Sequence, residues 1–67
     1  MPMISYELRQ KVWSIRTWKW EVVSVTFSES LARHEFKIAA KENPDIYLEL
    51  IKVYLTEDCL EFTPKAS

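Results

Sequence analysis

Apolar and polar residues alternate over positions 4–15 and again over positions 18–28, in stretches rich in β-branched and aromatic side chains. Alternation with a period of two is typical of strands with one buried face. The two stretches therefore predict an antiparallel hairpin. Its connection is either a two-residue turn at Arg16 and Thr17 or a four-residue loop from Ser14 to Thr17.

Both loop lengths are even, so they place the side chains in the same way. Even positions of the first strand then share a face with odd positions of the second, because side chains alternate along each strand. This rule gathers an apolar set at the open end of the hairpin, which we expect to lie in the core. The set is Ile4, Tyr6, Leu8, Val23, Val25 and Phe27.

The opposite face of the hairpin changes character along its length, from charged and hydroxyl side chains at the open end to aromatic ones near the turn. A β-bulge near residues 22–23 would rotate the turn end and bring the aromatic rings into the core. Without a bulge they are exposed, and clustered exposed aromatics mark binding surfaces. We predict a protein-binding surface at four residues near the turn: Trp13, Ile15, Trp18 and Trp20.

Residues 29–42 have the apolar spacing of an amphipathic helix. Ser28 is a suitable N-cap, and Asn43 before Pro44 ends the pattern, because proline disfavours helical geometry in the preceding residue. The residues on one side are small or apolar, which favours close packing on a sheet. They are Ala32, Phe36, Ala39 and Ala40.

The most apolar stretch of the chain, residues 46–55, predicts a central strand covered at least partly on both faces. Residues 56–58 then predict a turn, and residues 59–63 a short edge strand. The element order is β-β-α-β-β within a single domain spanning 1–67. We expect an α+β fold of two layers, with one helix packed on one face of a mostly antiparallel sheet of three to four strands.

Basic residues recur on the polar side of the predicted helix at Arg33, Lys37 and Lys41, interleaved with glutamates. This pattern is usually a solvated helix face, and these three residues are candidates for contact with an acidic partner or a nucleic acid. The chain has 9 basic and 10 acidic residues and a net charge of −1. Nucleic-acid-binding domains are normally basic, so this balance favours a protein partner over a nucleic acid.

Composition excludes several kinds of site. The sequence contains no glycine, so the phosphate-binding and nucleophile-bearing motifs that need glycine are absent. Cys59 and His34 are single residues of their types, which excludes an internal disulfide and falls short of a structural zinc site. We expect no catalytic residue, cofactor, metal or small-molecule substrate. We also expect no membrane segment and a cytoplasmic protein.

The layout from Trp20 to Val53 resembles small accessory proteins carried by bacteriophages and related mobile elements, including inhibitors of host RNA polymerase and anti-CRISPR proteins. The resembling features are a strand that ends Val-Thr-Phe-Ser, a helix that begins Glu-Ser-Leu-Ala-Arg, an Asn-Pro-Asp stop and a following β-rich strand. The resemblance implies a host-directed protein that binds and blocks a target without catalysis.

Three functional hypotheses follow from the sequence. The first is a non-enzymatic protein-binding module that engages a partner or a second copy through the tryptophans. The second is a nucleic-acid-binding regulator that uses the basic helix stripe. The third is a structural subunit that is stabilised by homo-oligomerisation, because a domain of 67 residues buries a small core.

Overall fold

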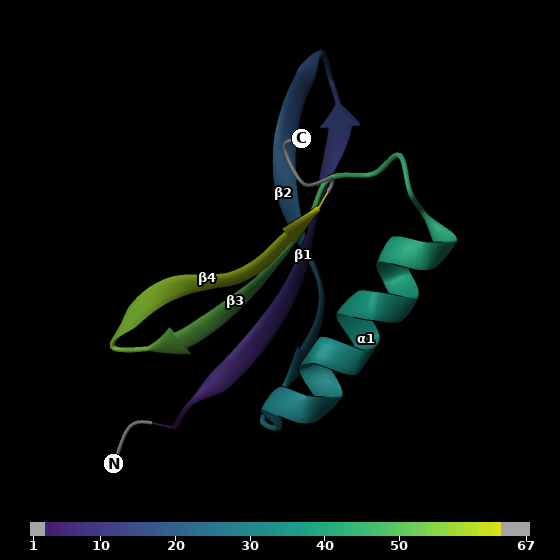
Figure 1. Cartoon of the computed structure of the whole chain (residues 1–67). Coiled ribbons are helices and arrows are strands. Elements are labelled where there is room, and N and C mark those ends of the chain that lie inside the picture. The colour runs from purple at the N-terminus through teal and green to yellow at the C-terminus, as the bar shows by residue number, and fades with distance from the viewer. Residues whose placement is uncertain (1–2, 64–67) are drawn as a thin grey trace.

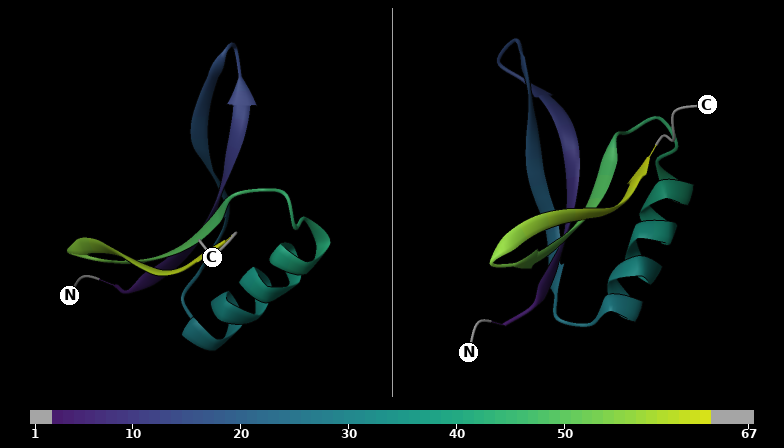
Figure 2. Two further views of the ribbon diagram at one scale, coloured as in Figure 1. Left: turned by 45° about the horizontal axis from the view of Figure 1, so that its top comes forward. Right: turned by 60° about the vertical axis from the view of Figure 1, so that its left-hand side comes forward.

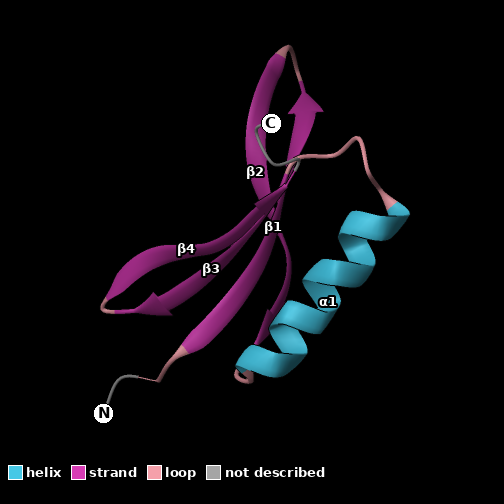
Figure 3. Ribbon diagram, viewed as in Figure 1, coloured by secondary structure: helices cyan, strands magenta, loops and turns pink. Residues whose placement is uncertain are grey.

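A computed structural model describes residues 3–63, which form four strands and one helix (Figure 3). The order β-β-α-β-β and the α+β class agree with the sequence prediction, and the helix bounds are those predicted. The elements are β1 (Ser5–Ser14), β2 (Thr17–Thr26), α1 (Glu29–Glu42), β3 (Leu48–Tyr54) and β4 (Thr56–Thr63).

The four strands form one antiparallel sheet in the order β2-β1-β3-β4. Since β1 is antiparallel to both of its neighbours, β2 and β3 run parallel to each other on either side of it. The chain passes from β2 to β3 through α1, which lies along one face of the sheet (Figure 1). The fold is thus two layers deep, and the other face of the sheet has no helix over it.

Local signals at both ends of α1 explain its bounds. The Ser28 side chain accepts a hydrogen bond from the backbone of Leu31, and Glu29 places an acidic group in the first turn. At the other end, the Asn43 backbone N–H donates to the carbonyl of Ala39. The capped helix therefore occupies the span that its apolar spacing predicts.

The core lies between α1 and the central strands. Leu50 of β3 is fully buried, and two helix residues, Ala32 and Phe36, pack into the same cluster. Polar groups at its edge are paired: the Tyr6 hydroxyl donates to Glu29 over 3.4 Å, and the Ser24 hydroxyl donates to Glu35 over 2.8 Å. The buried cluster comprises Tyr6, Leu8, Ala32, Phe36, Leu48 and Leu50.

The hairpin of β1 and β2 extends beyond the rest of the sheet. Strand β3 pairs with β1 only from Ser5 to Gln10, and the Lys11 N–H then donates to the carbonyl of Tyr47 over 2.9 Å. From there to the turn, β1 pairs with β2 alone. The end of this hairpin, hereafter the ribbon (residues 11–20), projects as two strands away from the helix and from β3 and β4 (Figure 2).

The turn of the ribbon differs from both sequence alternatives. Ser14 pairs with Thr17, so the two turn residues are Ile15 and Arg16. Their φ angles are 47° and 63°, in the left-handed region that a two-residue hairpin turn needs and that asparagine or glycine would normally fill. In a chain without glycine, a β-branched residue occupies this position at a conformational cost of about 1–2 kcal/mol.

A β-bulge interrupts β2 near the predicted place, but its effect is the opposite of the predicted one. Leu8 pairs with Ser24 and Arg9 with Val22, so Val23 is the extra residue. Strand β1 has no extra residue there, and its alternation continues unbroken into the ribbon. The bulge therefore reverses which side chains of β2 point toward the helix at the open end of the hairpin. At the aromatic end, the side chains of β2 keep the same faces as their partners in β1.

The predicted apolar set at the open end is consequently wrong in part. Tyr6 and Leu8 are buried as expected, but beyond the bulge they share their face with Thr26 and Ser24. Val25 instead pairs with Glu7 on the opposite face. The remaining members of the predicted set are all exposed: Ile4, Val23, Val25 and Phe27.

The second hairpin also differs from its prediction. Strand β3 begins at Leu48 and not at residue 46, and its turn is made at Leu55, which has a φ of 62°. Strand β4 runs from Thr56, so residues 56–58, predicted as a turn, are strand. The side-chain hydroxyls and carboxylates of these residues favour a turn in the sequence, but pairing with β3 keeps them extended.

Candidate functional site

The three tryptophans lie on the face of the sheet that α1 does not cover. Lys11 pairs with Trp20 and Trp13 with Trp18, so all four side chains share one face of the ribbon. Trp13, Trp18 and Trp20 remain 59%, 54% and 41% exposed. Of the two readings that the sequence left open, the structure shows the exposed one.

Ile15, the fourth residue of the predicted surface, lies in the turn and is 91% exposed. It is adjacent to the tryptophans in the chain but is not part of their strands. The ribbon therefore presents a row of indole rings with an aliphatic side chain at its end. An exposed apolar group of this size is unfavourable in water unless another molecule covers it.

Two of the indole rings contact each other across the ribbon. The ring centroids of Trp13 and Trp18 lie 5.3 Å apart at an interplanar angle of 63°, an edge-to-face arrangement. Such a pair contributes about 0.5–1.5 kcal/mol beyond the area it buries. Because an isolated two-stranded hairpin is marginally stable in water, this contact also helps to hold the ribbon together.

Lys11 connects the tryptophans to the body of the sheet. Its Nζ lies 6.0 Å from the ring centroids of both Trp18 and Trp20 and 5.7 Å from that of Tyr47. The Tyr47 ring lies in turn 6.4 Å from that of Phe62 on β4. Lys11 thus lies between two rings of β2 and the ring of Tyr47, which comes directly before β3. We call the five aromatic residues the aromatic face: Trp13, Trp18, Trp20, Tyr47 and Phe62.

An ion-pair cluster, hereafter the acidic cluster, lies on the same side of the sheet toward its open end. Arg9 contacts Glu7 at 2.9 Å, Glu57 at 3.2 Å and Glu49 at 3.8 Å. The hydrogen bond to Glu57 raises the pKa of the Arg9 guanidinium, although partial burial acts in the opposite direction. One positive charge faces three carboxylates, so the four side chains carry a net charge of −2.

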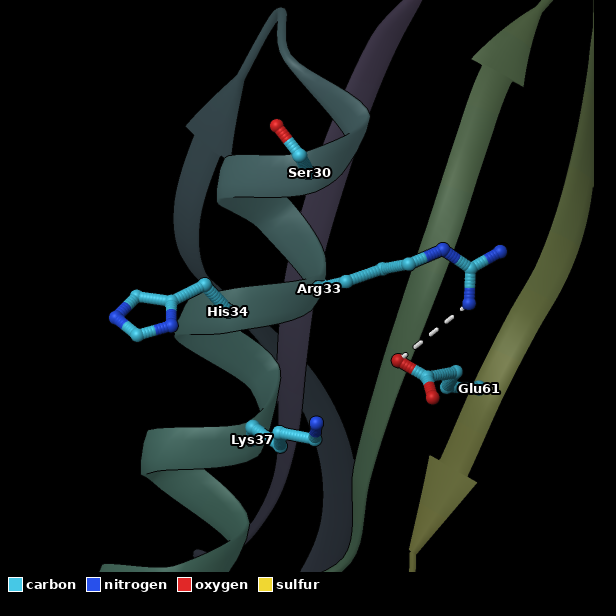
Figure 4. Close-up of a pocket in the computed structure, with 5 residues that line it drawn as sticks. All are labelled: Ser30, Arg33, His34, Lys37 and Glu61. Carbon is cyan, nitrogen blue, oxygen red and sulfur yellow. Dashed lines mark ion pairs between the residues drawn. The ribbon is translucent and has the colours of Figure 1, made fainter.

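The basic helix stripe lies apart from the aromatic face. A shallow hollow of about 260 Å³ lies beside it, lined by Ser30, Arg33, His34, Lys37 and Glu61. Arg33 bonds to Glu29 at 3.1 Å and reaches across to Glu61 of β4 at 3.7 Å, whereas the His34 ring points away from Glu61 (Figure 4). Arg33 is therefore partly neutralised, while Lys37 and Lys41 are exposed.

The cysteine and the histidine, which are the residues most suited to catalysis, do not lie together in the structure. Cys59 pairs with Ile51, which pairs with Glu7, so its side chain lies on the face away from the helix that carries His34. Partial desolvation and the Glu49 carboxylate raise the pKa of the Cys59 thiol, which disfavours the reactive thiolate. Within residues 3–63, no group of three histidine, cysteine or carboxylate side chains is arranged so that it could hold a metal ion. No helix in that part of the chain has the length and apolar character needed to cross a membrane.

Sequence reasoning missed Tyr47 and Phe62. Tyr47 comes directly before β3 and Phe62 lies in β4, and their proximity to the tryptophans depends on the pairing of β3 with β1. The alternation of residues 46–55 indicates that Tyr47 and Glu49 share a face, but only the strand order places that face beside Lys11. No family model, curated protein or solved structure matches this chain.

Proposed function

We propose that the protein is a non-enzymatic binding module that engages another protein surface through its aromatic face. The observation that carries this proposal is the exposure of five aromatic side chains on the one sheet face that the helix leaves uncovered. Tryptophan and tyrosine dominate the energetics of protein interfaces, because each buries a large area with few rotatable bonds.

The chain folds without needing these rings in its core. The buried cluster between α1 and the sheet is complete without the tryptophans, and its edge hydroxyls have partners. A contiguous apolar surface that does not contribute to the core needs a different explanation, and binding is the usual one. A phage-type inhibitor or modulator of a host protein complex is one form of this proposal, supported by the resemblance in layout alone.

A nucleic-acid partner is the second candidate, and one observation favours it. Residues 10–20 contain three basic residues, three tryptophans and no acidic residue. Aromatic stacking combined with basic side chains is how many proteins hold single strands. The acidic cluster on the same sheet face opposes this reading, since it repels phosphate. Binding to a single-stranded oligonucleotide that weakens steeply with added salt would favour it.

Site-specific photo-cross-linking tests the proposal. A photoreactive phenylalanine derivative is placed at position 18 of the full chain, and, as a matched control, at position 30 on the exposed helix surface. Irradiation of cells that produce each variant is expected to give protein adducts from position 18 and few from position 30. Mass spectrometry then identifies the adducts, including adducts with a second copy of the chain.

Substitution of the tryptophans distinguishes a loss of binding from a loss of folding. Trp18→Ala combined with Trp20→Ala is expected to remove the adducts formed from a probe at position 13, while the circular dichroism of α1 is unchanged. Lys37→Ala, at an exposed helix position, is expected to leave them intact. Absence of any protein adduct from position 18 in the folded chain contradicts the proposal.

A further inference from the structure

Charge is distributed unevenly along the uncovered face of the sheet. The ribbon carries Lys11 on the aromatic face, Arg16 in the turn and Lys19 on its other side, with no acidic residue among residues 10–20. None of these three bases forms an ion pair with any residue between 3 and 63. At the open end the acidic cluster has a net charge of −2. One surface thus has an acidic end and a basic end, and the basic end also carries the exposed tryptophans.

The edges of the sheet are poorly suited to pairing with a further strand. Both edge strands are irregular: Val23 is an extra residue in β2, and Leu60 is an extra residue in β4. Bulges interrupt the row of backbone groups that an added strand would use, and proteins use them to prevent pairing at sheet edges. The uncovered face is therefore the better surface for association than either edge.

We infer that the partner of the aromatic face is a second copy of this chain, packed face to face with its ribbon over the acidic cluster of the first. This inference rests on the proposed function and names its partner. A symmetric dimer uses the same patch on both copies, so the patch must be complementary to itself. A surface that is basic at one end, acidic at the other and carries exposed aromatic side chains meets this requirement.

The charges select one of two symmetric arrangements. A twofold axis parallel to the strands places ribbon on ribbon and acidic cluster on acidic cluster, which opposes like charges. A twofold axis across the strands places each ribbon over the open end of the other copy's sheet, which carries the acidic cluster. Only the second arrangement pairs opposite charges at both ends, and like charges held together at an interface weaken binding.

The strand register shows that the charges match along the strand direction under the second arrangement. Glu49 lies opposite Arg9, one residue before Gln10, and Lys11 lies one residue after it. Glu57 lies opposite Val53, which pairs with Ser5, five residues before Gln10, and Arg16 lies six residues after it. Glu57 lies on β4, two strands from β1, whereas Arg16 lies at the turn between β1 and β2. A twofold axis that crosses β1 near Gln10 therefore has to be tilted from the perpendicular to the strands, as the roughly 30° angle between packed sheets allows, to bring Lys11 toward Glu49 and Arg16 toward Glu57 of the other copy.

A charge exchange tests this arrangement by sedimentation equilibrium at chain concentrations up to roughly 100 μM, where interfaces of micromolar affinity are populated. The wild-type chain is expected to dimerise. Arg16→Glu and Glu57→Lys are each expected to weaken dimerisation by about tenfold, because each opposes like charges at both ends of the interface. Both positions are exposed, so neither change disturbs the core.

The combined variant distinguishes pairing from general damage. With both substitutions in one chain, opposite charges face each other again, and dimerisation is expected to return to near the wild-type level. An equimolar mixture of the two single variants is expected to form heterodimers, which a mass difference between the chains reveals. If Glu57→Lys perturbs folding because it places a positive charge beside Arg9, Glu57→Gln is used instead. The loss of dimer affinity is then expected to be smaller than for Glu57→Lys.

Two results overturn the inference. One is a wild-type chain that stays monomeric while a probe at position 18 still forms adducts with other proteins, which leaves the proposed function standing. The other is a dimer whose charge-reversal losses add in the combined variant, which shows that Arg16 and Glu57 do not meet. A monomer that forms no adducts but binds a single-stranded oligonucleotide through Trp18 and Trp20 overturns both the inference and the proposed function.

Discussion

The two faces of β1 belong to the same ten residues but have opposite roles. On the side covered by α1, Tyr6 and Leu8 are buried among helix and β3 side chains. On the other side, Lys11 and Trp13 are left to solvent or to a partner, although Trp13 is a large aromatic residue and bulkier than either buried residue. Hydrophobic character alone therefore does not decide burial in this fold. A side chain of β1 is buried only where α1 and β3 extend far enough to cover it.

This difference predicts that stability and association can be changed separately. Substitutions under the helix are expected to alter the free energy of unfolding, because they open cavities in a small core. Substitutions on the aromatic face are expected to alter association and to have smaller effects on unfolding. Each prediction below tests this division, beginning with the largest effect.

Leu50→Ala is expected to be the most damaging change. Leu50 is fully buried, and truncating such a side chain costs about 2–5 kcal/mol. A domain of this size has little more than that in total, so the variant should be largely unfolded in a urea titration. The matched change on the other face, Val25→Ala, should cost less than about 1 kcal/mol, since Val25 is 51% exposed. Equal losses would mean that the two faces do not differ.

Trp18→Ala is expected to lower the free energy of unfolding by about 1.5 kcal/mol and to abolish association. The stability loss comes from the edge-to-face contact with Trp13 and from cross-strand packing in the ribbon. Thermal denaturation followed by far-ultraviolet circular dichroism measures the first effect, and sedimentation measures the second. A loss above about 3 kcal/mol would place Trp18 in the core and contradict its assignment to a binding surface.

Replacing the ribbon turn is expected to act in the opposite direction on stability. Ile15→Asn with Arg16→Gly supplies the residues that a left-handed two-residue turn favours, and should raise the free energy of unfolding by about 1 kcal/mol. The same change removes an exposed apolar side chain and a turn charge, so association should weaken. A variant that is more stable and associates as well as wild type would show that Ile15 has no part in binding.

The smallest expected effect concerns Cys59. Its pKa is raised by partial desolvation and by the Glu49 carboxylate, so at pH 8 the thiolate fraction is lower than for a free cysteine. Alkylation by iodoacetamide at pH 8 should therefore be slower, and its rate should rise with pH through the raised pKa. Glu49→Gln should speed the reaction at pH 8, whereas Glu21→Gln should not. An unchanged rate in Glu49→Gln would rule out this electrostatic effect.

Local signals in the sequence were sufficient for the helix and for the order of elements. The N-cap at Ser28 and the stop at Asn43 depend on neighbouring residues, and both are found where the sequence predicts them. The prediction of which side chains share a face of the hairpin was also correct in the ribbon, where strand pairing is regular. It failed beyond Val23, because one inserted residue reverses the facing of every later position in β2.

The candidate site was only partly visible in the sequence for a related reason. The tryptophans are close together in the chain, so their cluster could be found from sequence alone. Tyr47 and Phe62 are distant in the chain, and the acidic cluster joins Glu7 to Glu57 across three strands. Such sites depend on strand order, which short-range patterns do not determine. The turn at Leu55 was not predicted for a different reason, because residues 56–58 have turn-forming side chains but pair with β3 as strand.

The ribbon extends past Gln10, the last residue of β1 that pairs with β3. Beyond that point its two strands pair only with each other. New residues can be introduced at positions such as Trp13 or Trp18 without altering how Leu50 and Phe36 are packed. Natural selection can therefore change what this arm recognises in small steps while the scaffold stays the same. For the same reason, the arm is a suitable position for grafting a recognition sequence in protein engineering.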